Sequence, residues 1–256
     1  MPHTLIVGDS GSGKSSSIKN LNKTRTVILN IERKPLPFRE AKEFGANNKM
    51  IESAPGFDSA FDSALRDKNV DTIVMESLQK YFEKLLELAK MGNKGYDIYN
   101  FYNEKVNSLL EKIKGCSTKQ IFAFAMPERV ENILPNGSIT TVRRCFVHGK
   151  QWESKIEKEF SIVLWTEVSR VDKTKPAEYK FVVNNDGTFS AKSPPDMFKG
   201  ITIDNDLALV QKATMEYYGL TFAEQQSPTT QSQKNSDVVI NKDSLLDKSL
   251  LNAVSK

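Results

Sequence analysis

Eight residues near the start of the chain have the types and the spacing of a phosphate-binding loop. They read Gly8-Asp9-Ser10-Gly11-Ser12-Gly13-Lys14-Ser15, which is the pattern G-x-x-x-x-G-K-S. The apolar run before them predicts a strand, and the residues from Ser16 to Leu21 predict a helix. Because a strand, a loop and a helix in this order direct several backbone N–H groups at one anion, the motif indicates nucleoside triphosphate binding. A surface turn rich in Gly and Ser is the alternative.

The side chains of this loop have separate expected roles. Lys14 is expected to reach the β- and γ-phosphates, and the Ser15 hydroxyl is expected to ligate Mg²⁺. Glycine at Gly8, Gly11 and Gly13 lets the loop take backbone conformations that other residues avoid. The residues expected to contact the phosphates are Asp9, Ser10, Gly11, Ser12, Gly13, Lys14, Ser15 and Ser16.

Hydrolysis needs an acid beyond the phosphate loop, and two glutamates directly follow predicted strands. Glu76 follows the apolar run 72–75 and is expected to hold Mg²⁺, with a helix cap as the alternative. Glu32 follows the run 26–31 and is expected to orient or deprotonate the attacking water, with an exposed charge as the alternative. Ligands bind outside the carboxyl ends of strands in sheets of this kind. Asp71 precedes its strand and is therefore expected at the wrong end.

Strand and helix signals alternate after the loop, which predicts an α/β fold with a mostly parallel sheet. Predicted strands begin by about Thr4 and then cover 26–31, 72–75, 120–125 and 160–165. Amphipathic patterns predict helices over 57–68, 77–91, 101–114 and 205–218. Asn-Gly and Asp-Gly turns predict β-hairpins over 130–147 and 178–192, which add antiparallel strands to the parallel core.

Length and composition divide the 256 residues into a domain over 1–222 and a polar tail over 223–256. The tail has too few large apolar residues to fold alone and is predicted to be disordered. Its segment 244–251 is either a frayed end or a short amphipathic docking helix.

Charge and cysteine content place few limits on function. The net charge of +4 is compatible with a nucleic-acid partner without requiring one. No targeting peptide and no membrane-spanning run are visible, so a cytoplasmic location is expected. Cys116 and Cys145 lack the spacing of a metal site, which favours free or buried thiols in a reducing compartment.

The order of these features resembles the RecA-like ATPase core, and the compact length resembles phage-encoded core-only proteins of that kind. These are known as phage nucleotide-binding proteins or Sak-type single-strand annealing ATPases. The resemblance covers about residues 4–218. Besides the phosphate loop and the two acids, it rests on the segments 147–150, 160–164, 191–198, 205–209 and 217–218.

The resemblance implies an ATPase that uses ATP and Mg²⁺, with Glu32 as the catalytic acid and Glu76 as the second acid. The family usually has Asp where Glu76 stands, so metal geometry and turnover are expected to differ. A polar residue usually ends the fourth strand as a γ-phosphate sensor, but Met126 stands there. That role is expected to be altered or to lie with Glu128 or Arg129.

The resemblance also implies an oligomer, a ring or a filament, that binds single-stranded DNA and is stimulated by it. Aromatic faces stack bases and basic side chains pair with phosphates, which makes the segment after the third strand one candidate. Its tyrosines have core packing as the alternative. The candidate DNA-binding residues are Lys94, Tyr96, Tyr99, Arg143, Arg144 and Lys150. By resemblance alone, Lys192 is a candidate finger that reaches the nucleotide of a neighbouring subunit. One residue of the basic cluster Arg143, Arg144 and Lys150 is an alternative finger.

The expected function is therefore ATP-dependent recombination or annealing on single-stranded DNA, in the host cytoplasm if the protein is phage-encoded. The tail is a candidate site for a single-stranded DNA-binding protein. An accessory ATPase of a helicase or of DNA packaging is the first alternative. A small-molecule P-loop kinase is the second, but it predicts an Arg-rich lid that the hairpin with Arg143 and Arg144 resembles poorly.

Overall fold

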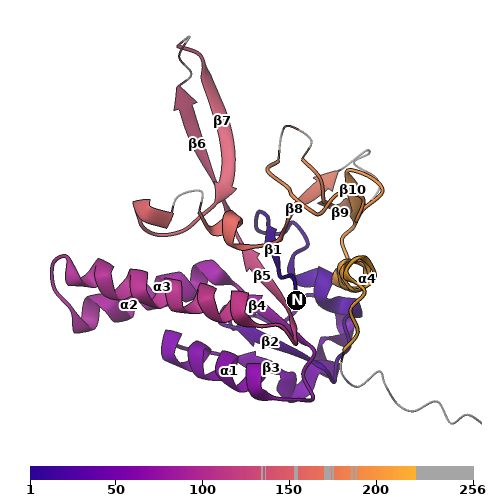
Figure 1. Cartoon of the computed structure of the whole chain (residues 1–256), viewed down its shortest axis with the longest axis horizontal. Helices are drawn as coiled ribbons and strands as arrows, with labels where there is room; N and C mark the ends of the chain where they lie inside the picture. Colours follow the sequence, from indigo (N-terminus) through magenta and orange to yellow (C-terminus); the bar gives the residue numbers. More distant parts are fainter. Residues whose placement is uncertain are drawn as a thin grey trace, which may run out of the picture. The chain divides into compact units, whose positions relative to one another are not determined.

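The computed structural model describes residues 1–133, 135, 137–152, 155–169, 174, 176–185, 187 and 189–222 (Figure 1). For residues 132, 140, 142 and 150 it describes the backbone without the side chain. The chain divides into two compact units, Met1–Ala223 and Glu224–Lys256. The polar tail predicted over 223–256 lies outside the described residues.

An eight-stranded sheet forms the centre of the first unit, in the order β10-β9-β8-β1-β5-β4-β2-β3 (Figure 1). Its strands are β1 (Thr4–Val7), β2 (Thr26–Asn30), β3 (Asn48–Met50), β4 (Thr72–Glu76), β5 (Gln120–Ala125), β8 (Ile162–Ser169), β9 (Glu178–Val182) and β10 (Thr202–Asp204). The strands from β8 to β3 pair in parallel, whereas β9 and β10 are antiparallel. The predicted α/β fold, a mostly parallel sheet with added antiparallel strands, is confirmed.

Alternate residues of each central strand enter two separate hydrophobic cores. In β1, Leu5 and Val7 pack on one face of the sheet and Ile6 packs on the other. β5 does the same, with Ala123 on the first face and Phe124 on the second. Both faces are apolar because successive side chains of a strand point to opposite sides and both sides are covered.

Helices cover both faces of the sheet. The first face carries α1 (Ala54–Arg66), α2 (Leu78–Gly92) and α3 (Asp97–Gly115), while α4 (Leu207–Tyr218) packs on the second (Figure 1). Short 3₁₀ helices complete the description: η1 (Ser15–Asn20), η2 (Arg39–Asn47), η3 (Lys150–Trp152) and η4 (Ile156–Glu159). The four predicted α-helices after the loop are confirmed, with starts shifted by up to one turn.

The strands β6 (Pro127–Ile133) and β7 (Ile139–Cys145) form the predicted first hairpin, a two-stranded sheet of its own. It starts directly beyond β5 and projects away from the central sheet (Figure 1). Glu128 lies opposite Arg144 at its base, and Ile133 lies opposite Ile139 at its far end. The hairpin therefore continues from the carboxyl end of β5, outside the central sheet.

The predicted second hairpin over 178–192 is wrong. β9 pairs instead with β8 on one side and with β10 on the other. β9 pairs only with Trp165–Ser169 of β8. The earlier part of the same edge pairs with Lys192, through a single antiparallel bridge to Val163. The turn residues 184–187 predict a chain reversal, but they do not specify which strand pairs with β9.

The helix predicted directly after the phosphate loop is a 3₁₀ helix. The Ser17 N–H is shared between the carbonyls of Gly13 and Lys14, at 3.0 and 3.2 Å. The Ser17 hydroxyl also donates to the Lys14 carbonyl. Serine side chains compete for backbone partners in this way and tighten the turn.

Candidate nucleotide-binding site

The phosphate loop is fixed to the end of β1 by its neighbours β5 and β8. The Gly8 N–H donates to the Ala125 carbonyl at 3.1 Å. Thr166 in the middle of β8 packs so closely that a Cβ on Gly8 would lie 1.7 Å from its hydroxyl oxygen. The Thr166 hydroxyl also donates to the Ser12 hydroxyl at 2.7 Å, and Ser12 donates to the Asp9 carbonyl at 2.6 Å. Gly8 and Ser12 therefore shape the loop.

A second close contact comes from β9. Gly13 has φ of +94°, and a Cβ there would lie 2.9 Å from the ring of Tyr179. Glycine is required at this position by both its conformation and its space. Tyr179 thereby becomes a wall of the nucleotide site, a position that the sequence alone did not indicate.

Lys14 lies along the inside of the loop. Its ammonium group donates to the carbonyls of Gly8 and Asp9, the second at 2.9 Å. Burial lowers the pKa of Lys14, and the nearby acids Glu76, Asp9 and Glu32 oppose that shift. A partly desolvated cation held by backbone carbonyls is placed to bind a polyphosphate more strongly than a cation in water.

Ser15 and Glu76, which the sequence assigns to Mg²⁺ binding, lie in direct contact. The Ser15 hydroxyl donates to Glu76 Oε1 at 2.6 Å, across the end of β5. Burial raises the pKa of Glu76, while the Ser15 hydrogen bond and the charge of Lys14 lower it. Glu76 Oε2 is buried and has no hydrogen-bond partner among the described residues. A serine hydroxyl and an orphaned carboxylate oxygen are hard oxygen donors, which fit Mg²⁺.

Glu32 lies at the same edge and is held from two sides. Ser77 donates its hydroxyl hydrogen to Glu32 Oε1 at 3.2 Å, and Lys34 pairs with Oε2 at 2.9 Å. This contact raises the pKa of Lys34. The Ser77 hydroxyl also accepts from the N–H of Lys80 at 3.4 Å, so Ser77 caps α2. The cap that sequence offered as an alternative for Glu76 therefore falls to its neighbour.

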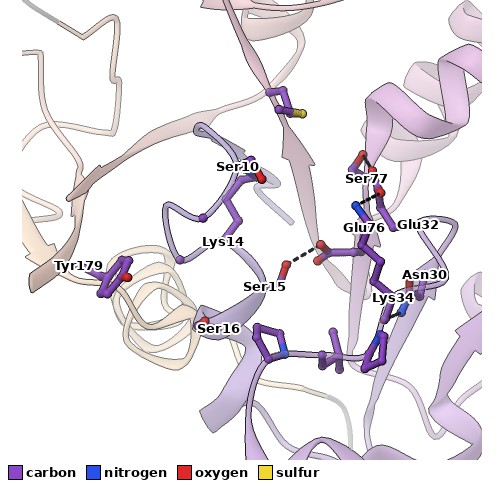
Figure 2. A pocket seen from close by; sticks show the side chains of 16 residues that line it. Ser10, Lys14, Ser15, Ser16, Asn30, Glu32, Lys34, Glu76, Ser77 and Tyr179 are labelled. Atoms are coloured by element: carbon purple, nitrogen blue, oxygen red, sulfur yellow. Dashed lines mark hydrogen bonds and ion pairs between the residues drawn. The ribbon is translucent and has the colours of Figure 1, made fainter. Parts of the chain in front are cut away.

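Lys14, Ser15, Glu32 and Glu76 line one pocket of about 450 Å³ (Figure 2). Figure 2 shows Ser15 facing Glu76, Lys14 running along the loop, and Lys34 reaching from the opposite wall to Glu32, which Ser77 also contacts. The wall opposite the loop is the segment 34–37, whose carbonyl at Lys34 accepts from Asn30 Nδ2 at 2.9 Å. The lining residues are Ser10, Gly11, Gly13, Lys14, Ser15, Ser16, Asn30, Glu32, Lys34, Pro35, Leu36, Pro37, Glu76, Ser77, Met126 and Tyr179.

Met126 contributes an apolar side chain to this pocket, at the position where the resemblance implies a γ-phosphate sensor. The two substitutes considered from sequence lie on β6, where Glu128 is paired with Arg144 at 2.6 Å and Arg129 is exposed. A polar side chain does approach from α2: Gln79 Nε2 donates to the Phe146 carbonyl at 2.8 Å and, more weakly, to that of Met126 at 3.4 Å.

The candidate DNA-binding residues lie on two segments. Lys94 and Tyr96 are exposed at the turn between α2 and α3, and Tyr99 is half exposed on the first turn of α3. On β7, Arg143 lies over the ring of Phe189 at 5.4 Å, and Arg144 is paired with Glu128. The side chain of Lys150 lies outside the description.

Lys192 sits beside β8, and burial lowers the pKa of its ammonium group. It does not line the nucleotide pocket of its own chain. Asp71 pairs with Arg25 at the start of β4, at the opposite end of the strand from Glu76, as predicted. Cys116 and Cys145 are both buried free thiols.

Three contacts of the site were not found from sequence. Lys34 follows Glu32 by two residues, and a polar run directly after a strand was a usable signal for it. Thr166 stands at the end of a predicted strand, so its place on the nucleotide edge was also open to prediction. Tyr179 gave no signal, because its approach to Gly13 depends on how β9 pairs.

A phosphate loop whose serine contacts a buried glutamate, at the carboxyl edge of a mostly parallel sheet, defines a P-loop nucleoside triphosphatase. The chain matches the AAA domain family AAA_24 over residues 2–194 and belongs to that family. It is a P-loop ATPase of this family. A comparison with curated proteins finds no match.

Two solved structures are similar to this chain at 10% sequence identity. One is a KaiC-like protein from Pyrococcus horikoshii, matched over 74% of this chain and 80% of that one with a TM-score of 0.38. The other is the flagellar accessory protein FlaH from Methanocaldococcus jannaschii, matched over 70% and 76% with a TM-score of 0.34. No helix in the described part of the chain has the length and apolarity needed to cross a membrane.

Proposed function

We propose that this ATPase hydrolyses ATP with Mg²⁺ and acts, as a homo-oligomer, in annealing or recombination on single-stranded DNA. The hydrolysis step is supported by the pocket itself. Lys14 and the backbone of the loop bind the phosphates, and Glu32 is placed across the pocket to accept a proton from the attacking water. Ser15 and Glu76 would hold Mg²⁺, which supplies charge neutralisation when bound.

One observation carries the DNA-binding part of the proposal. Both segments with candidate DNA contacts begin at residues of the nucleotide pocket. α2 starts directly after Ser77 and leads to the turn that carries Lys94 and Tyr96. β6 starts directly after Met126 and leads into the hairpin that carries Arg143. One continuous element therefore leads from the nucleotide pocket to each of the two segments.

Exposed tyrosines beside a lysine fit a single strand better than a duplex or a small acceptor. Tyr96 and Tyr99 offer faces on which any base can stack, and Lys94 offers a charge for a phosphate. Binding of this kind depends little on sequence and strongly on salt. A neighbouring subunit meeting the nucleotide would align such segments into one groove, with Lys192 as its candidate finger.

The test is equilibrium binding of fluorescent single-stranded DNA with ATP analogue, with ADP and without nucleotide, over a range of salt. We expect tightest binding with the analogue and a shallower salt dependence for Lys94→Ala, by about 0.7 in the log–log slope. Lys68→Ala is the matched control, because Lys68 is exposed just before β4, at the opposite edge of the sheet. Lack of binding at low salt with the analogue bound would favour the accessory ATPase instead.

A further inference from the structure

Three tyrosines of the α3 segment lead from solvent into the protein. Tyr96, Tyr99 and Tyr102 follow one another at intervals of three residues, which places them near one face of the helix. Their exposed fractions are 77%, 50% and 1%. A stripe of rings therefore runs from the α2–α3 turn inward along α3.

The stripe ends at a second cavity, of about 540 Å³, which shares no lining residue with the nucleotide pocket. It is bounded by α2, α3, the start of β6 and the segment that follows β7. The lining residues are Leu86, Tyr99, Tyr102, Glu128, Phe146, Val147, His148 and Gly149. Its size falls within the range of about 300–1,000 Å³ typical of small-molecule and cofactor sites.

The wall of this cavity combines rings with unused hydrogen-bonding groups. The rings of Phe146 and His148 meet edge to face, with centroids 4.9 Å apart. The Tyr102 hydroxyl and His148 Nε2 are both buried, and neither has a hydrogen-bond partner among the described residues. Buried polar atoms are nearly always paired in folded proteins, so two orphans around one cavity indicate a ligand with polar atoms of its own.

We propose that this cavity takes one nucleobase of the single strand, turned out of its stack; the inference rests on the DNA-binding function proposed above. A base is flat, stacks on Tyr99 and carries donors and acceptors at its edge for Tyr102 and His148. An apolar side chain of a protein partner would leave both groups unpaired. Lys94, at the exposed end of the stripe, is placed to pair with the phosphates that follow the base.

The backbone of the cavity wall is tied to the nucleotide pocket. The Phe146 carbonyl accepts from Gln79 Nε2 at 2.8 Å, and the Phe146 N–H donates to the Met126 carbonyl at 2.9 Å. Met126 lines the nucleotide pocket, and Gln79 lies two residues after Ser77. A base in the cavity and a nucleotide in the pocket thus act on the same short segment, which links the two binding events.

The test compares two oligonucleotides, one that carries 2-aminopurine and an otherwise identical one with abasic sites, each bound to the full chain with ATP analogue. Leu86→Trp fills the cavity, and Leu86→Met is its volume-conserving control. We expect the wild type to bind the base-containing strand about tenfold more tightly than the abasic one and to change the 2-aminopurine fluorescence. Leu86→Trp should lose both effects, and Leu86→Met should keep both.

Tyr102→Phe is a second variant that does not depend on tolerance of a larger side chain. It removes only a hydroxyl without a described partner, so folding should be unaffected. We expect weaker binding of the base-containing strand and unchanged binding of the abasic strand. Tyr218→Ala, at 41% exposed on α4, is the control for general loss of an exposed ring and should match the wild type.

Two results would overturn the inference, and both are distinguishable from a failure of the proposed DNA-binding function. Equal affinity of the wild type for both strands would show that DNA binds through its backbone and that the cavity takes no base. An unchanged fluorescence response in a folded Leu86→Trp protein would place the base elsewhere. Failure of the wild type to bind either strand would instead remove the proposed DNA-binding function itself.

Discussion

The carboxylate of Glu32 is held by two partners of opposite character. Ser77 belongs to the cap of α2 and is fixed by it, whereas the Lys34 side chain is 78% exposed. An exposed ion pair contributes little to stability, so the Lys34 contact is better suited to orienting the acid than to holding the fold. The Glu32 carboxylate is thus oriented at the pocket and remains accessible to solvent.

The first prediction concerns Glu32 as the base of hydrolysis. We expect Glu32→Gln to bind ATP normally and to release phosphate more slowly, by roughly 10²–10⁴-fold, because the amide cannot accept the proton. Single-turnover phosphate release at saturating ATP measures this. Glu52→Gln is the control, since Glu52 is an exposed glutamate paired with Arg33 outside the pocket. A normal rate in Glu32→Gln would move the role to another acid, with Glu128 the next candidate.

The second prediction concerns Glu76, whose pKa burial raises. The folded state then binds the proton more tightly than the unfolded state, so this residue's contribution to stability is lost as pH rises through the folded pKa. Glu76→Gln removes the ionisable group and therefore this loss of stability at higher pH. We expect the melting temperature of the nucleotide-free variant, relative to that of the wild type, to increase from pH 5 to pH 8, and about 1 kcal/mol corresponds to roughly 2–4 °C in a domain of this size.

The same Glu76→Gln variant should lose the effect of Mg²⁺ on ATP affinity, because the orphaned carboxylate oxygen would be replaced by an amide nitrogen. Thermal melts at pH 5 and pH 8, with and without Mg²⁺–ATP, measure both effects. A variant that melts lower at both pH values and still responds to Mg²⁺ would contradict the assigned role.

At the scale of elements, β1 is locked to α3 and β5 by one buried histidine. His3 Nε2 donates to the Cys116 carbonyl at 3.0 Å, just beyond α3. The Ile121 N–H on β5 donates to His3 Nδ1 at 3.3 Å, which requires the neutral ring. The strand that leads into the phosphate loop is therefore anchored at its opposite end by a group that titrates.

The third prediction follows from that anchor. Burial lowers the pKa of His3 to about 4, below its ordinary value near 6.5. The unfolded chain binds the proton first as pH falls, so stability present above pH 6.5 should be lost progressively towards pH 4, by an amount on the order of a few kcal/mol. His3→Gln should be less stable at pH 7 but should lose much less stability across this window.

Urea denaturation at pH 7, 5.5 and 4.5 measures the slope for His3→Gln and the wild type. The chain has two histidines, and His148→Gln is measured in parallel as the comparison for replacing the other one. Parallel slopes for His3→Gln and the wild type would show that other groups govern acid stability.

At the scale of the whole molecule, the fourth prediction is that residues 223–256 are dispensable for folding and ATP binding. The described part of the first unit already contains both hydrophobic cores and the complete pocket. We expect a chain ending at Phe222 to melt and bind ATP like the full chain. A chain ending at Leu220 should be less stable, because Phe222 is buried.

Thermal unfolding and ATP titration of both truncations test this prediction. If the chain ending at Phe222 melts several degrees below the full chain, then the tail, including the apolar segment 244–251, packs on the body. If it folds but no longer supports annealing with a single-stranded DNA-binding protein present, the tail is the recruiting segment suggested by its composition.

The sequence by itself predicted that the phosphate loop and two acids meet at one edge of the sheet. The phosphate loop is recognisable because its spacing is local, and Glu32 and Glu76 could be placed because each directly follows an apolar strand. Parallel strands bring their carboxyl ends to one edge, so residues far apart in the chain were predictable neighbours. The Ser15–Glu76 contact at 2.6 Å is the direct consequence.

Only the tertiary structure decided what surrounds that site. A strand signal does not name its partner, so the pairing of β9 with β8 and β10, and with it the contact of Tyr179 with Gly13, was not predictable. Helical spacing put Tyr99 and Tyr102 on one face but left their burial open, because burial depends on the elements that pack against α3. Packing buried Tyr102 and left Tyr99 half exposed, and both line the second cavity.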